Sequence, residues 1–180
     1  DYGGAQWHLA GALASQVTNS DRNQAFDKYV AGPCGLEVYK YGNMAAQDKY
    51  VFTGHPDSLE GTGNPHSGGG AISSLRDMAK LLLLHVRGGM CGDTRVLSQE
   101  SVKAMQVDRI EGLANPYFPG LSYGMGWWNR NDVSPTMFSD SGIYGSVAWI
   151  DTQRMIGGFI AIDDYSRGSY ANSLNLVFSE

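Results

Sequence analysis

The segment that most constrains the fold is residues 121–162, where three apolar and aromatic clusters are separated by turn residues. The clusters cover residues 123–128, 144–150 and 155–162, and they are rich in the β-branched and aromatic residues that favour strands. The polar link at residues 151–154 predicts a hairpin between the last two clusters. We therefore expect three adjacent strands with one well-buried face.

Outside this segment, apolar residues recur at helical spacing. The expected helices are residues 5–18, residues 21–31, one that starts at 73–77 and stops at 88–89, a short one after Ser98, and residues 167–180. Ser20 is the expected N-cap of the second helix, and Ser74 with Asp77 resembles a capping box for the third. Because the apolar arc of the first helix is wide and includes Leu9 and Leu13, we expect that helix to be mostly buried.

This order of elements predicts an α+β fold, with an antiparallel sheet flanked by helices. Residues 1–120 would form a mostly helical lobe with loops, and residues 121–180 would supply three sheet strands and a C-terminal helix. No domain boundary is evident, so the chain is expected to be a portion of a single domain. Residues 37–70 lack apolar periodicity, and the long loop expected there serves either as scaffold or as a lid that borders a site.

Composition and motif content exclude several classes of function. The net charge is −5 and the 13 Lys and Arg residues form no cluster, so nucleic acid is not an expected partner. The longest apolar run, residues 81–84, is far too short to span a bilayer. The four His residues have no partner at metal-ligand spacing, and no P-loop motif occurs, so neither a metal nor a cofactor is expected.

The residues that could act as a nucleophile are not marked by any local motif. Neither a Gly-x-Ser-x-Gly elbow nor a Ser-x-x-Lys pair occurs in the chain. No serine therefore has its own base nearby in the sequence. The two cysteines, Cys34 and Cys91, allow either one disulfide or two buried thiols.

Six short motifs resemble, in the same order, motifs of the C-terminal half of the serine β-lactamase and penicillin-binding-protein-like family, near its class C and esterase branches. They are residues 2–11 (Tyr-x-Asn turn and helix), 33–36 (Pro-Leu-Gly-Met), 69–79 (Gly-Gly-Leu-x-Ser-Thr-x-x-Asp-Leu-Ala), 92–98 (Gly-Lys-Arg-Leu-Leu-Ser), 123–127 (Tyr-Gly-Leu-Gly-Trp) and 140–142 (Lys-Thr-Gly or His-x-Gly). Each match is short, but together they cover nearly the whole chain. The resemblance implies the fold and the hydrolytic chemistry of that family.

In that family, the serine of Ser-x-x-Lys attacks a carbonyl and forms an acyl-enzyme, and the tyrosine of Tyr-x-Asn assists proton transfer. Carried over to this chain, the resemblance makes Tyr2 the general base and the backbone N–H of Ile143 an oxyanion donor. Ser141 and Gly142 would line the cleft, at the opening of the second expected strand. The Ser-x-x-Lys segment and the first strands of the sheet would precede Asp1, because the chain begins as if mid-fold.

Two residues depart from the family pattern at positions that would bind substrate. Gly4 stands where the family has Asn, so a side-chain hydrogen bond is lost. Asp140 stands where the family has Lys or His, and a carboxylate there would repel a substrate carboxylate. We therefore expect neutral esters or amides in preference to penicillins. Without the resemblance, Tyr2 is a terminal aromatic residue and Asp140 a turn residue at a strand end.

Two functions are consistent with this pattern. The first is the C-terminal part of a serine hydrolase that acts through an acyl-enzyme on esters, amides or β-lactams, with this chain alone inactive. The second is a non-catalytic or truncated relative that binds a peptide or cell-wall ligand. The resemblance implies a periplasmic or secreted protein, in which a bond between Cys34 and Cys91 would persist. The expected partners are a small-molecule substrate, the missing N-terminal part of the same protein, and a second copy paired through an exposed sheet edge.

Overall fold

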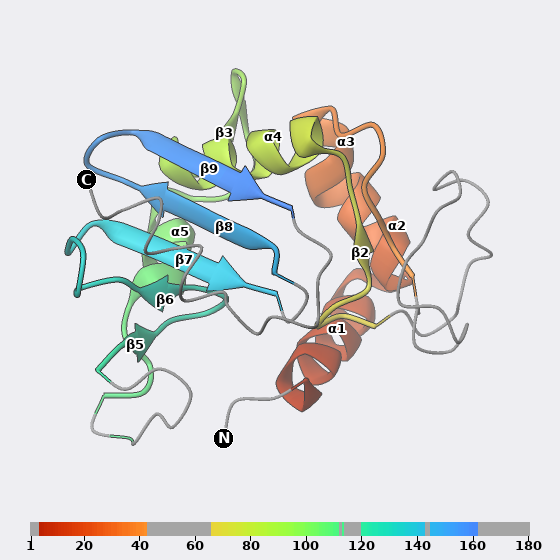
Figure 1. Ribbon diagram of the computed structural model, residues 1–180. Helices are drawn as coiled ribbons and strands as arrows, with labels where there is room; N and C mark the ends of the chain where they lie inside the picture. The colour runs from red at the N-terminus through yellow and green to blue at the C-terminus, as the bar shows by residue number, and fades with distance from the viewer. Residues whose placement is uncertain (1–3, 43–65, 112, 114–119, 143–144, 162–180) are drawn as a thin grey trace. The chain divides into compact units, whose positions relative to one another are not determined.

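The structure is a computed structural model that describes residues 4–42, 66–111, 113, 120–142 and 145–161. The chain divides into two compact units, residues 1–78 and 79–180. Figure 1 shows the elements of both units, which are described separately below. Whether they form one domain stays a prediction, and the helix expected at residues 167–180 lies outside the described residues.

The first unit is mainly helical. Its elements are α1 (Ala5–Thr18), α2 (Arg22–Phe26), the π-helical turn η1 (Asp27–Ala31), α3 (Gly32–Cys34), and the antiparallel strands β1 (Lys40–Tyr41) and β2 (Ala71–Ile72). The bounds of α1 are those expected from the sequence. The second expected helix is split by the π-helical turn, continues past residue 31 and ends at Gly35, which has a positive φ of 61°. Its cap is Asp21, whose side chain accepts a hydrogen bond from Gln24 N, and the expectation of Ser20 as the cap was wrong.

The expectation that α1 is mostly buried was wrong. No residue of α1 is buried, and Leu9, Leu13 and Val17 are 63%, 58% and 85% exposed. The helix meets the rest of its unit through the opposite face, where Gly11 lies against the side chains of Arg22 and Ser67. Gly11 thus contributes to this contact together with Trp7, which lies beside Gly68, whereas Leu9, Leu13 and Val17 are exposed.

Aromatic rings and a buried carboxylate hold the start of the expected long loop in the first unit. Tyr39 and Tyr41 pack against Phe26, with ring centroids 4.9 and 5.7 Å away. The backbone N–H groups of Glu37 and Val38 donate to Asp77 Oδ2 at 3.0 and 2.7 Å, and Asp77 is fully buried.

The capping interaction expected at the start of α4 (Leu75–Val86) is present only in part. Ser74 Oγ accepts a hydrogen bond from Asp77 N at 3.1 Å, as an N-cap residue does. In a full capping box the Asp77 side chain would accept from the backbone N–H of Ser74. Here the Asp77 carboxylate accepts from the backbone N–H groups of Glu37 and Val38 instead.

The second unit contains a five-stranded antiparallel sheet in the order β5-β6-β7-β8-β9. The strands are β5 (Ser122–Tyr123), β6 (Trp128–Asn129), β7 (Met137–Ser141), β8 (Val147–Asp151) and β9 (Ile156–Ile160). The antiparallel arrangement and the β8–β9 hairpin confirm the sequence prediction. The expected number of three strands was wrong for two reasons. The first cluster forms two short strands around a glycine turn, and the strand β7, which contains Ser139 and Asp140, was not predicted.

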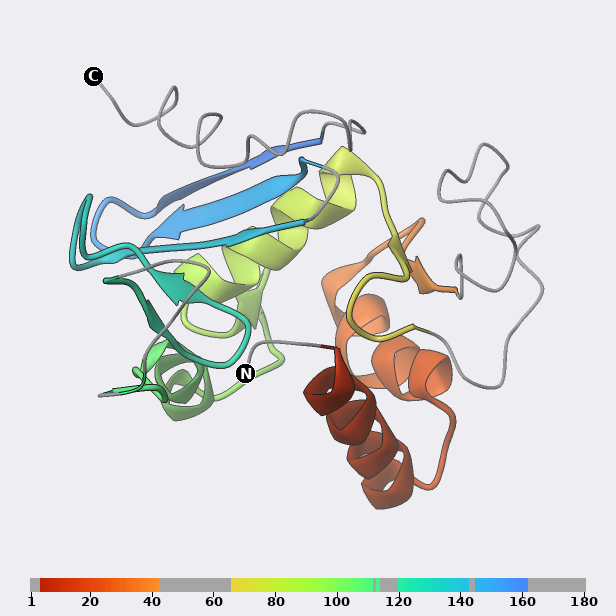
Figure 2. The ribbon, with the colours of Figure 1, turned by 60° about the horizontal axis from the view of Figure 1, so that its bottom comes forward.

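Helices cover one face of this sheet. The C-terminal half of α4 and the helix α5 (Gln99–Gln106) lie along it, and Figure 2 shows both on the same side of the strands. A short hairpin of β3 (Met90–Cys91) and β4 (Thr94–Arg95) joins the two helices. The short helix predicted after Ser98 is present, and Ser98 caps it by accepting a hydrogen bond from Ser101 N at 3.0 Å.

The core of the second unit is aliphatic and aromatic. Its buried cluster consists of Leu82, Val86, Trp127, Phe138 and Ile150. Trp128 is buried as well and its ring lies 4.4 Å from that of Tyr123, so neither of the adjacent tryptophans is a surface residue. None of the described helices is both long and apolar enough to cross a membrane.

Candidate active site

The candidate substrate-binding segment, residues 140–142, lies at the end of β7. Asp140 pairs with Ala148 of β8, and Ser141 pairs with Val147. The position expected from sequence was the opening of the next strand, but the chain pairs through Ser141, turns, and starts β8 only at Val147. The segment therefore belongs to a strand inside the sheet, with neighbours on both sides.

The turn that follows this segment is tight and depends on two glycines. Gly142 N donates to Ser146 O at 2.8 Å, and Gly145 N donates to Gly142 O at 3.0 Å. A Cβ at Gly142 would collide with Ser146 Oγ, and Gly145 has a φ of 95°, in the region that favours glycine. Ser146 was not among the predicted site residues. Its position directly after Gly145, before an apolar run, is the only local signal of its role.

Asp140 is the electrostatically unusual residue of the segment. Its atom Oδ1 is buried and has no hydrogen-bond partner among the described residues. Burial raises the pKa of Asp140 to about 7, although the backbone N–H of Ser141 acts in the opposite direction. Strand alternation places Asp140 on the same face of the sheet as Phe138, the face that α4 and α5 cover. A carboxyl with this pKa can donate or accept a hydrogen bond near neutral pH.

Of the other expected site residues, the structure describes only Gly4. Gly4 belongs to the first unit and is the N-cap of α1, where its carbonyl accepts from Trp7 N and His8 N at 3.2 and 3.3 Å. No atom lies within 4 Å of the position that a Gly4 Cβ would take, so an Asn side chain, as in the family motif, would fit. Tyr2 and Ile143 lie outside the described residues. Among the expected site residues that the structure describes, Asp140, Ser141 and Gly142 are the ones that lie together in the second unit.

The described residues offer neither a metal site nor a cysteine nucleophile. They contain no group of three or more His, Cys, Asp or Glu side chains that could hold a metal ion. Cys34 and Cys91 are both disulfide-bonded, and no described cysteine is a free thiol. Cysteine nucleophile chemistry therefore has no candidate in the described part of the chain.

Comparison with known proteins decides the family. Residues 2–175 match the Beta-lactamase family. The chain belongs to the Beta-lactamase family. Protein Rv1367c of Mycobacterium tuberculosis strain H37Rv is a curated relative, 24% identical over 164 residues that cover 78% of this chain and 41% of the relative. The chain thus spans less than half the length of that relative.

Solved structures of the family share the fold. EstCE1, a hydrolase with promiscuous acyltransferase activity, has a TM-score of 0.69 at 18% identity, over 94% of this chain and 54% of its own. The octameric penicillin-binding protein homologue from Pyrococcus abyssi also has a TM-score of 0.69 at 18% identity, over 99% of this chain and 42% of its own. The chain therefore has the mixed helix-and-sheet fold of β-lactamase-like proteins, as the sequence predicted.

Proposed function

We propose that this chain is the C-terminal part of a serine hydrolase that acts through an acyl-enzyme on esters or amides. The observation that carries the proposal is the match of residues 2–175 to the Beta-lactamase family. The placement of residues 140–142 at the end of β7 supports it, because the motif that they resemble directly precedes the residue whose backbone N–H is the expected oxyanion donor. Tyr2 serves as general base and the N–H of Ile143 as an oxyanion donor, with the serine nucleophile supplied by a segment that precedes Asp1 in the complete protein.

The charge state of Asp140 favours neutral substrates. When ionised, a carboxylate within about 4–6 Å of a substrate carboxylate costs on the order of 1–4 kcal/mol, depending on the effective dielectric. Because burial raises the pKa of Asp140 to about 7, this repulsion increases as the pH rises through 7. Neutral esters lack the carboxylate and are not affected.

Asp140→Lys in the complete protein tests this preference. The kcat/KM for a carboxylate-bearing β-lactam should rise relative to that for a neutral short-chain ester, and Asp140→Asn should have a smaller effect in the same direction. A ratio that stays constant, or moves toward the ester, would show that Asp140 does not face the substrate.

A second function, binding of a peptide or cell-wall ligand without catalysis, is favoured by two residues. Gly4 and Asp140 replace the amide and the cation that the family motifs carry, so two substrate-binding groups are altered. A relative that retains the cleft and loses these groups could still bind a ligand. We also propose a secreted or periplasmic location for the protein, and its only support is the family resemblance.

Intact-mass spectrometry after incubation with a p-nitrophenyl ester and a chromogenic cephalosporin separates the two functions. The chain of 180 residues has no Ser-x-x-Lys pair and should form no acyl adduct. The protein encoded by the full reading frame should form one, with a burst of product. Ligand binding by the full protein with neither adduct nor turnover would support the second function and reject the first.

A further inference from the structure

A cavity in the second unit lies at the opposite end of β8 from residues 140–142. Its walls come from the end of α4, from β3, from α5 and from the β8–β9 turn, and its volume is about 560 Å³. This volume falls within the usual range for small-ligand sites, roughly 300–1,000 Å³. Since β8 has five residues at about 3.3 Å each, this cavity is separated from the candidate active site by roughly the length of the strand. We call it the α4–α5 cavity.

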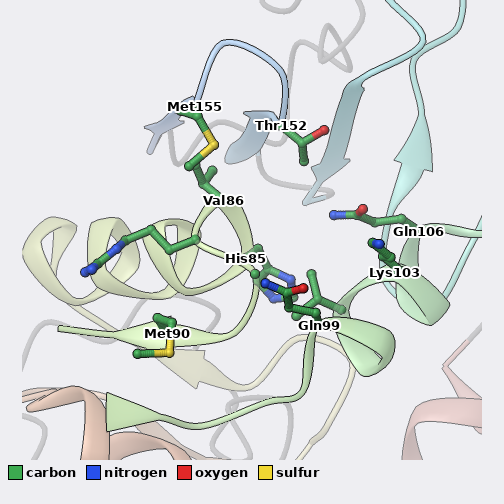
Figure 3. Close-up of a pocket in the computed structure, with 11 residues that line it drawn as sticks. His85, Val86, Met90, Gln99, Lys103, Gln106, Thr152 and Met155 are labelled. Atoms are coloured by element: carbon green, nitrogen blue, oxygen red, sulfur yellow. The ribbon is translucent and has the colours of Figure 1, made fainter. Parts of the chain in front are cut away.

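Two polar atoms in the wall of the α4–α5 cavity are buried without partners. They are His85 Nδ1 and Gln106 Nε2, neither of which has a hydrogen-bond partner among the described residues. Figure 3 shows the amide of Gln106 directed from α5 toward His85, with Lys103 beside it. Native proteins rarely leave buried donors unsatisfied, so these atoms indicate a missing partner.

The charges in the wall indicate the sign of that partner. The lining contains Arg87 and Lys103 and no Asp or Glu. Lys103 and Gln106 are three residues apart on α5 and therefore lie on the same face of the helix. One carboxylate can accept from the ammonium of Lys103 and the amide of Gln106 together. Burial lowers the pKa of His85 to about 4, so the ring is neutral at pH 7 and can donate from Nδ1 without adding charge.

The rest of the wall is apolar. Val86, Val102, Met90 and Met155 line it, and in Figure 3 Met155 lies above His85 and Met90 below it, both to its left. Methionine side chains adapt to ligands of different shape, as in other promiscuous apolar sites. An aliphatic chain would contact these residues while its polar end reached α5.

We propose that the α4–α5 cavity binds a small organic monocarboxylate with an aliphatic chain. The carboxylate lies between Lys103, Gln106 and His85, and the chain lies against Met90 and Met155. This site is distinct from the candidate active site and does not depend on the hydrolase function.

Methyl NMR of the chain labelled at methionine tests the proposal, because Met90 and Met155 line the cavity whereas Met105 and Met137 do not. Hexanoate should shift the methyl signals of Met90 and Met155 in a saturable way. The expected dissociation constant is about 1 mM, which corresponds to a binding free energy of about −4 kcal/mol. Hexanol, which has the same chain length and no charge, should bind about tenfold more weakly.

Matched variants locate the carboxylate. Gln106→Leu should weaken hexanoate binding about tenfold and Lys103→Gln about threefold, whereas Lys28→Gln, which removes a cation in the first unit, should have no effect. Hydrogen bonds from its own backbone and from Ser98 lower the pKa of Glu100, and the charge of Lys103 adds to this effect. Glu100→Gln removes a negative charge that acts on Lys103 and should therefore tighten binding of a carboxylate.

Three results would overturn the proposal. They are the absence of saturable shifts at Met90 and Met155, equal affinity for hexanoate and hexanol, and unchanged affinity in both Gln106→Leu and Lys103→Gln. Circular dichroism of each variant shows that it is folded before its affinity is compared. If Gln106→Leu does not fold, Lys103→Gln and Glu100→Gln, both at exposed positions, carry the test.

Discussion

The raised pKa of Asp140 should make the stability of this chain depend on pH. In the unfolded chain the carboxyl ionises near its ordinary pKa of 3.8, whereas in the folded chain its pKa is raised to about 7. Between these values the folded state holds one more proton than the unfolded state. The free energy of unfolding therefore falls as the pH rises from about 4 to about 7. Replacement of Asp140 by Asn removes this dependence and keeps the size of the side chain.

The magnitude follows from the pKa shift. A rise from 3.8 to about 7 is roughly three units, and each unit corresponds to 1.36 kcal/mol, so ionised Asp140 costs about 4 kcal/mol above pH 7. Asp140→Asn should therefore have nearly the stability of the unmodified chain at pH 4 and exceed it by about 4 kcal/mol at pH 8. A gain of this size is a large part of the stability of a typical domain.

Urea unfolding followed by tryptophan fluorescence at pH 4, 6 and 8 measures this difference. Asp93→Asn is the matched control, because it removes a carboxylate that is exposed in the β3–β4 turn and changes the net charge equally. A stability difference between Asp140→Asn and the unmodified chain that stays constant with pH would refute the reasoning. It would mean that the Asp140 carboxyl is solvated or paired in the folded protein.

Three further changes test the packing of the chain. Asp77→Ala should lower the free energy of unfolding, measured with urea, by roughly 2–4 kcal/mol, because two backbone N–H groups lose their acceptor. A loss no larger than that of an average surface substitution would contradict this. Gly70→Ala should lower the melting temperature by several degrees, because the added Cβ would collide with the carbonyl oxygen of Gly42; an unchanged melting temperature would show that this turn can relax. Thiol counting in denaturant without reductant should find no free thiol, and reduction of Cys34 and Cys91 should cost about 4 kcal/mol; two free thiols before reduction would reject the bond.

Elements with a strong local signal could be predicted from the sequence. The bounds of α1, the cap of α5 at Ser98 and the β8–β9 hairpin all depend on residues close together in the chain. The exposure of Leu9 and Leu13 could not be predicted, because an apolar arc indicates which face can be buried and not which neighbour covers it. Strand β7 was missed because Ser139 is buried, which breaks the alternation that marks a half-buried strand.

The candidate site could be predicted only in part, for a similar reason. The motif at residues 140–142 was recognised from residue types, and the tight turn follows from the two glycines. The raised pKa of Asp140 could not be predicted, because it comes from burial by residues distant in the sequence. The α4–α5 cavity had no sequence signal at all, since His85 and Gln106 are single polar residues on otherwise ordinary helices.

Two fully buried carboxylates provide a comparison for Asp140, which is partly buried. Asp77 and Asp151 are both fully buried. Asp77 accepts from two backbone N–H groups, and Asp151 accepts from Thr136 Oγ1, from two backbone N–H groups of the β8–β9 turn and from Arg154. Burial alone would raise the pKa of Asp151, but these hydrogen bonds lower it to about 2, so its carboxylate stays ionised and holds the turn.

Asp140 has fewer such bonds, and only the backbone N–H of Ser141 opposes the effect of burial on its pKa. Its Oδ1 lacks a partner among the described residues, and its pKa is raised where that of Asp151 is lowered. Folding gains nothing from a buried carboxyl in this condition, since an apolar residue of similar size would not carry the cost of desolvation. Costs of this kind concentrate at functional sites, where a group is kept for what it binds. The contrast between Asp151, whose carboxylate is held by several hydrogen bonds, and Asp140, whose Oδ1 has no partner among the described residues, therefore supports a substrate-facing role for Asp140 on grounds other than the sequence motif.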